Sequence, residues 1–190
     1  MYKRQANNHP IYNPSLDYSV YLSQPFFFVL FQVLILLTTV YTVGIEIKFR
    51  TATDWLATAK GNMITAVWGK LLPYTFIYIL IGWLGNYVMF GILHIPFQGS
   101  WWLINMITVL FVIATQALGL FIFSLFPAVS LVISVVSMVG SLGATLSGVT
   151  FPVSNMYPLV RDASYLFPVR HFTEMIPVSY THLRAHETTL

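Results

Sequence analysis

The side chains that could bind a metal or activate a substrate are few, and they gather near the C-terminus. His182, His186 and Glu187 bring together imidazole and carboxylate groups, which are ligands that zinc accepts. The chain has no cysteine, which excludes disulfides, zinc–thiolate sites and a cysteine nucleophile. Gly69 and Lys70 are adjacent, but the Gly-x-x-x-x-Gly-Lys-Ser/Thr pattern of a phosphate-binding loop is absent. A C-terminal metal site is therefore the first chemistry to weigh.

That C-terminal stretch does not read as natural protein sequence. Residues 178–188 match the translation of a transposase-derived sequencing adapter. We therefore expect residues 178–190 to be a sequencing artefact, and we exclude them from functional reasoning. The apparent metal site is excluded with them, which leaves no predicted catalytic, cofactor or metal site.

The rest of the chain has the composition of a membrane protein. Hydrophobic residues make up 57% of the sequence and charged residues only 8%. No Asp, Glu, Lys or Arg occurs from Tyr18 to Ile45 or between Lys70 and Arg161, where His94 is the one readily titrated side chain. Because about 20 apolar residues cross a bilayer as a helix, these runs predict an all-α integral membrane protein with about four transmembrane helices.

Helix-breaking residues divide the apolar runs into spans. Pro25 indicates the start of the first helix, the segment 95–100 reads as a turn, and Pro127 ends the third helix. An alternative merges the last two spans into a helix, a re-entrant turn and a helix. We predict spans at about 24–44, 71–93, 101–126 and 128–149, followed by short re-entrant or surface helices.

Basic residues predict the orientation, because short cytoplasmic loops retain Lys and Arg. The segment 46–70 contains Lys48, Arg50, Lys60 and Lys70, whereas the turn at 94–100 contains no basic residue except His94. We therefore place 46–70 in the cytoplasm. The chain is then a multi-pass protein of the cell's inner (plasma) membrane.

These observations predict a simple organisation. We expect residues 1–22 to be the extracytoplasmic remnant of a domain that belongs to a longer protein. Residues 23–150 form the transmembrane domain, which includes the cytoplasmic segment 46–70. Residues 151–177 form an extracytoplasmic re-entrant segment, and residues 178–190 are set aside as the artefact.

Polar residues inside the predicted spans are the candidates for a transport pathway. Such side chains are unfavourable in lipid unless they face protein or water, so they line a pathway or form hydrogen bonds between helices. His94 reads as an interfacial residue. Intramembrane catalysis needs paired acids, a Ser–His pair or metal ligands, and the predicted spans contain no acid. The candidates are Asn86, Asn105, Thr115 and Gln116.

Small residues recur every four positions in the last predicted span. Gly140, Ala144 and Gly148 would give this helix a smooth face for close packing. We interpret that face as a helix-packing surface.

The cytoplasmic segment contains a short amphipathic helix. Thr53 is a suitable capping residue, and Trp55, Leu56 and Ala59 are spaced to share an apolar side. That side could enter a groove on a partner, or it could rest on lipid headgroups with Trp55 as an anchor.

Two charged residues bracket this segment at the membrane borders. Lys70 could anchor the topology by extending its amino group to the interface, or it could form an ion pair with Glu46.

The order of several motifs resembles the permease subunit of ABC-2 type transporters. Thr51 lies five residues after the cytoplasmic Glu46, a short helix follows, and Gly69-Lys70 precede a proline that enters the next helix. Two more helices lead to Phe-Pro and Pro-x-x-His-Phe motifs in residues 151–172. One departure is Arg50, which stands where the family often has glycine.

The resemblance implies a function and partners. The chain would be the C-terminal half of a permease that couples ATP hydrolysis in a separate ABC ATPase subunit to export of drugs, lipids or polysaccharides. It would act with a second permease, as a homo- or heterodimer, in the lipid bilayer, without a cofactor or enzymatic activity of its own. The sparse basic residues argue against nucleic-acid binding. A membrane-embedded enzyme and a structural scaffold are the alternatives. The coupling segment would comprise Glu46, Arg50, Thr51, Trp55, Leu56, Gly69 and Lys70.

Overall fold

A computed structural model describes residues 18–93, 100–126, 128–147 and 156–173; for residues 18–22 it describes the backbone alone. Every regular element in these ranges is helical. The third helix continues into a wider π-helical turn, η1, and a further helical stretch covers residues 168–173. The helices are α1 (Tyr18–Lys48), α2 (Ala52–Thr58), α3 (Met63–Asn86) with η1 (Tyr87–Ile92), α4 (Trp101–Leu125), α5 (Val129–Leu146) and α6 (Pro158–Ser164).

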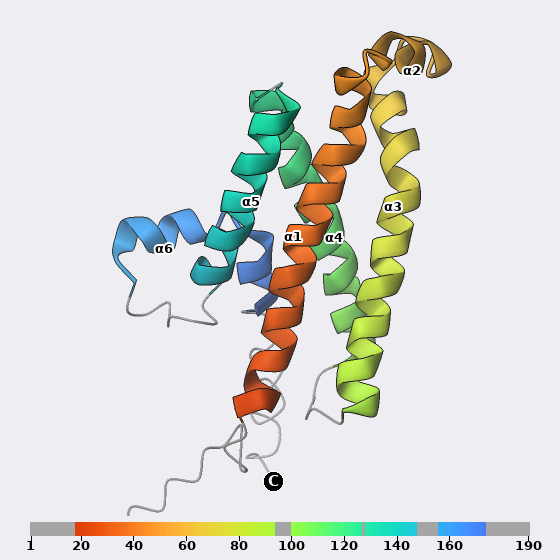
Figure 1. Cartoon of the computed structure of the whole chain (residues 1–190). Helices are drawn as coiled ribbons and strands as arrows, with labels where there is room; N and C mark the ends of the chain where they lie inside the picture. Colours follow the sequence, from red (N-terminus) through yellow and green to blue (C-terminus); the bar gives the residue numbers. More distant parts are fainter. Residues whose placement is uncertain (1–17, 94–99, 127, 148–155, 174–190) are drawn as a thin grey trace, which may run out of the picture.

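Four long helices form an up-and-down bundle around α1. Figure 1 shows α1 in the middle, with α3 on one side, α5 on the other and α4 behind it. The core lies along α1, where Phe28, Ile35, Leu36 and Val40 are fully buried. The short helix α2 lies across the tips of α1 and α3 at one end of the bundle (Figure 1). The connection between α1 and α3, which contains α2, therefore lies at one end of the bundle.

The predicted fold class is confirmed. Within the described residues, four helices are long and apolar enough to cross a membrane, at Ser23–Lys48, Met63–Ile92, Trp101–Leu125 and Val129–Leu146. Large apolar side chains such as Leu72, Phe76 and Leu110 are more than half exposed on the outside of the bundle. Apolar side chains on the outer surface are what a lipid environment requires.

The second long helix begins earlier than the predicted span at 71. Asn62 caps its N-terminus, because the side-chain oxygen accepts hydrogen bonds from the backbone N–H groups of Ile64 at 3.0 Å and Thr65 at 3.3 Å. Lys70 therefore lies inside the helix and does not mark its border. The connection between α1 and α3 shrinks to residues 49–62, which include α2.

Two prolines lie within helices instead of at their starts. Pro25 is inside α1 and Pro73 is inside α3. Membrane helices tolerate proline because neighbouring helices and hydroxyl side chains satisfy the freed backbone groups. The expectation that Pro25 begins the first helix is therefore wrong.

The segment after α5 turns back into the bundle. Figure 1 shows α6 beside α5 at a steep angle to it. Tyr157 and Leu159 at its start are exposed, whereas Phe172 in the stretch 168–173 is buried and stacks on Phe28 of α1 with 3.7 Å between ring centroids. Gln32 of α1 accepts a hydrogen bond from the Val169 N–H at 2.9 Å. One short helix thus lies on the surface and the next enters the core.

The orientation can be tested with single cysteines, because the chain has no cysteine of its own. Thr58 in α2 and Ser100 before α4 are both exposed, at opposite ends of the bundle. An impermeant maleimide should label Thr58→Cys only from the cytoplasmic side and Ser100→Cys only from the outside. Labelling of both positions from one side would contradict the four-span topology.

Candidate functional site

Glu46 ties together the ends of α1 and α3 at the end of the bundle where α2 lies. Its carboxylate accepts hydrogen bonds from the Lys70 ammonium group of α3 and from the Thr51 hydroxyl just before α2. The Glu46 and Lys70 side chains are each 20% exposed, so water screens this ion pair less than a fully exposed one. Of the two readings of Lys70, the structure contains the ion pair.

The apolar side of α2 faces its own bundle. Lys70 Nζ lies 5.2 Å from the centroid of the Trp55 ring, within the range of a cation–π interaction. Trp55, Leu56 and Ala59 are half-buried, whereas Thr53, Asp54, Ala57 and Thr58 are exposed. The outward surface of α2 is therefore made of small and polar side chains, with the edges of Trp55 and Leu56 beside them.

A left-handed turn at Arg50 connects α1 to α2. Arg50 has a φ of 59°, its N–H donates to the Ile47 carbonyl at 3.2 Å, and the Thr51 N–H donates to the Glu46 carbonyl at 2.9 Å. This is a Schellman motif, in which glycine is the usual left-handed residue. Arg50 thus forms this turn without glycine.

The end of α2 repeats this arrangement with Lys60. Lys60 has a φ of 55°, and the Gly61 N–H donates to the Leu56 carbonyl at 3.0 Å. A left-handed conformation costs a residue with a Cβ about 1–2 kcal/mol. A cation near a helix C-terminus contributes only about 0.3–1 kcal/mol. The helix dipole does not fully offset the strain, so both turns would be more stable with glycine.

Gly69 is exposed on α3, and a Cβ added there would meet no atom within 4 Å. Packing within the described chain therefore does not require glycine at this position.

The polar residues of the spans join α3 to α4. The Asn86 amide donates to Thr108 Oγ1 at 2.9 Å and to Asn105 Oδ1 at 3.3 Å. About three helical turns along α3 from Asn86, the Thr75 hydroxyl donates to Gln116 Oε1 at 2.7 Å. Hydrogen bonds between helices hold membrane bundles together. Asn86, Asn105 and Gln116 therefore take part in helix–helix contacts.

Thr115 has a more local contact. Its hydroxyl donates to the Phe111 carbonyl of its own helix at 2.7 Å, and the side chain is fully buried. The structure does not place it beside Asn86 and Asn105.

The small residues of α5 face α1. A Cβ at Gly140 would lie 2.8 Å from Val33 Cγ2, and one at Gly143 would lie 2.6 Å from Gln32 Nε2. Ala144 is partly buried against the core. Gly148 and His94 lie outside the described residues. The prediction from a four-residue spacing did not include Gly143, which lies three residues after Gly140 on the same face of α5.

A buried arginine in the re-entrant segment was also missed. Arg170 is 1% exposed, its Nη1 donates to the Arg161 carbonyl at 2.8 Å, and its Cζ lies 4.0 Å from the Tyr165 ring centroid. Buried charges need hydrogen bonds and aromatic or ionic partners. Arg170 therefore fastens α6 to the helical stretch that follows it.

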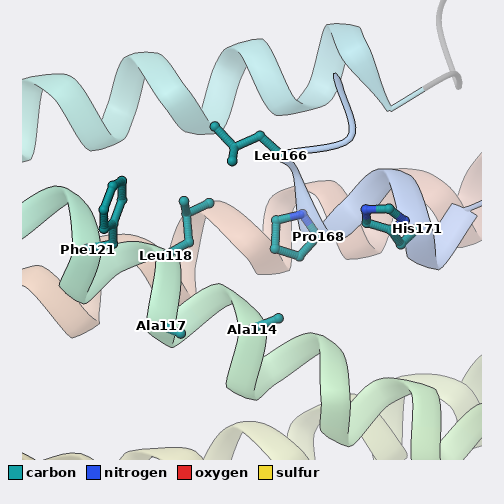
Figure 2. A pocket seen from close by; sticks show the side chains of 7 residues that line it. All are labelled: Ala114, Ala117, Leu118, Phe121, Leu166, Pro168 and His171. Atoms are coloured by element: carbon teal, nitrogen blue, oxygen red, sulfur yellow. The ribbon is translucent and has the colours of Figure 1, made fainter. Parts of the chain in front are cut away.

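An open apolar groove of about 480 Å³ lies between α4 and the re-entrant segment (Figure 2). His171 at its edge is its one titratable side chain, and His171 Nε2 lies 2.8 Å from the Tyr165 carbonyl oxygen. A groove of this composition offers apolar contact and lacks paired acids or a nucleophile–base pair. Its lining consists of Ala114, Ala117, Leu118 and Phe121 of α4 with Leu166, Pro168 and His171.

No group of three or more His, Cys, Asp or Glu side chains that could hold a metal occurs among the residues that the structure describes. His182, His186 and Glu187 lie outside those residues.

The fold and these contacts define a multi-pass helical membrane protein with a short helix held across one end of its bundle. The chain belongs to the ABC-2 transporter family, because the model of the "ABC-2 family transporter protein" matches residues 2–177. It is also similar to the "Probable multidrug ABC transporter permease YbhS" of Escherichia coli K12 and of Escherichia coli O157:H7.

Both relatives are 29% identical to the chain over 111 residues, which is 56% of this chain and 29% of each relative. The matched region thus spans less than a third of these relatives. No solved structure gives a significant match.

Proposed function

We propose that this chain is part of the permease subunit of an ABC-2 type exporter in the inner (plasma) membrane. A separate ABC ATPase subunit would hydrolyse ATP, and a second permease subunit would complete the membrane pathway. The family match across all four long helices carries this proposal. The relatives are named as probable multidrug permeases, which supports drugs as a substrate class.

The geometry at the end of the bundle supports a role for α2 as the coupling element. Glu46, Thr51 and Lys70 connect α2 to α1 and α3 through side-chain contacts. Trp55 adds a contact from α2 itself to Lys70. A force applied to α2 by the ATPase would therefore reach the ends of two transmembrane helices directly. A freely hinged loop would absorb such a displacement.

The two alternatives are a membrane-embedded enzyme and a structural scaffold. An enzyme would need acids or another proton-transfer pair at membrane depth, yet no Asp or Glu occurs between Lys70 and Arg161. A scaffold would need no ATPase partner, so association with an ATPase subunit separates the scaffold from the permease.

Replacing Trp55 and Leu56 together with alanine tests the coupling role. Both side chains are only half-buried, so part of their surface is open to a partner, and truncating an interface anchor commonly costs about 2 kcal/mol or more. In the intact permease, the double variant should lose most of its copurification with the ATPase subunit and should lower ATP hydrolysis. Copurification and gel-based quantification, with hydrolysis measured on the same sample, give the result.

The matched control is Trp68→Ala with Leu72→Ala on α3. These are the same two residue types, and their side chains are 59% and 56% exposed on the outside of the bundle. The control should keep the ATPase bound. Unchanged copurification and hydrolysis in the α2 variant would remove the case for coupling through this helix.

A further inference from the structure

Three cations surround α2 at the membrane border. The span of α1 ends at Lys48 and the span of α3 begins at Met63, so Lys48, Arg50 and Lys60 lie within a few residues of the apolar helices. All three side chains are exposed. Glu46 and Lys70 neutralise each other, which leaves Asp54 as the exposed acid of this segment. The exposed surface around α2 is therefore net positive.

Two of these cations occupy backbone positions that favour glycine. Arg50 and Lys60 both take the left-handed conformation, and the helix dipole offsets only part of the strain. Neither has an ion-pair partner among the described residues. The strain is thus retained at two positions where glycine would relieve it, and the shared feature of the two residues is an exposed positive charge.

Large apolar side chains lie exposed next to the cations. Phe49 is 65% exposed, Ile64 is 70% exposed and Trp68 is 59% exposed. Apolar and aromatic residues beside exposed cations are typical of the headgroup region of a membrane. Because the apolar side of α2 faces the bundle, α2 itself has no apolar face free to lie in lipid.

We propose that Lys48, Arg50 and Lys60 form a surface that binds the phosphate groups of anionic lipids in the leaflet next to α2. Each cation at a membrane surface attracts anionic lipid electrostatically. The outward surface of α2 stays free of lipid and open to a protein. This lipid surface is independent of the proposed transport function.

The test uses the full chain with Thr58→Cys carrying a fluorophore, reconstituted in vesicles of phosphatidylcholine and phosphatidylglycerol in a four-to-one ratio. A quencher is placed on the headgroup of one lipid or the other. The local ratio of phosphatidylglycerol to phosphatidylcholine should rise severalfold above the bulk ratio, because each cation near the surface attracts anionic lipid by about 1 kcal/mol. Arg50→Gly with Lys60→Gly should reduce the enrichment severalfold, and added salt should weaken it in the parent chain.

The double glycine variant should fold normally, because glycine takes the left-handed conformation of both turns without strain. Its thermal stability should be unchanged or raised, so a loss of enrichment would reflect the lost charges. Arg50→Lys with Lys60→Arg keeps both charges and should keep the enrichment. Arg161→Gln, on α6, should also keep it. Equal quenching by both lipids in the parent chain, or unchanged enrichment in the glycine variant, would overturn the proposal and favour an acidic protein surface as the ligand of these cations.

Discussion

Replacing Gly82 with alanine should destabilise the bundle, although alanine is the better helix former. A Cβ at position 82 of α3 would lie 2.5 Å from Thr108 Cγ2 of α4, closer than real Cβ atoms approach. Thr108 cannot rotate away freely, because its hydroxyl donates to the Ile104 carbonyl at 2.8 Å and accepts from Asn86 at 2.9 Å. Overpacking of this kind costs about 1–3 kcal/mol. The midpoint of thermal unfolding in detergent should fall.

Two further variants isolate the steric cause. Thr108→Ser removes the clashing methyl group but keeps the hydroxyl, so adding it to Gly82→Ala should restore much of the lost stability. Gly69→Ala is the matched control in the same helix, because no atom lies within 4 Å of its added Cβ. It should be neutral or stabilising by about 0.5–1 kcal/mol. A Gly82→Ala variant as stable as Gly69→Ala would contradict the close approach of α3 to α4.

The fold class could be predicted from the sequence because it depends on composition over long windows. The uncharged run before the segment 46–70 contains one long helix, and the run after it contains two more and most of a third. Helix ends depend on local contacts instead. The start of α3 at Met63 follows from the Asn62 cap. Counting charges placed the membrane border of this helix at Lys70, because the sequence does not show that Glu46 neutralises Lys70.

The side-chain contacts were less predictable, because they depend on how each helix is rotated about its axis. Asn86, Asn105 and Gln116 could be named as candidates from their cost in lipid, but the sequence left pathway lining and helix contact open. The positions of Thr108 and Thr75 opposite them appear only in the packed bundle.

The re-entrant segment contains the clearest residue that sequence reasoning missed. Arg170 lies between prolines and aromatic residues, which predicted surface or re-entrant helices without indicating which side chains are buried. Phe167 and Val169 before it and Phe172 after it are all buried. That apolar pattern was the available signal that this stretch packs into the core.

The ion pair between Glu46 and Lys70 should control how often α2 detaches from the bundle. Removing one partner leaves the other half-buried and unpaired, which should cost about 1–2 kcal/mol, between the values for exposed and buried pairs. A cysteine at the half-buried Ala59 reports this opening, because its labelling rate follows the population of the open state. Glu46→Gln and Lys70→Met should each raise that rate about tenfold, since 1.4 kcal/mol is a factor of ten.

The double variant shows whether the two residues act as a pair. Glu46→Gln with Lys70→Met should label only slightly faster than either single variant, because the second change has no ion pair left to break. Asp162→Asn is the control: Asp162 lies 4.0 Å from Arg161 with side chains 73% and 48% exposed, so this change should leave labelling at Ala59→Cys unaltered. Rates that multiply in the double variant would show that Glu46 and Lys70 act independently, and the ion pair would then not be what holds α2 against α1 and α3.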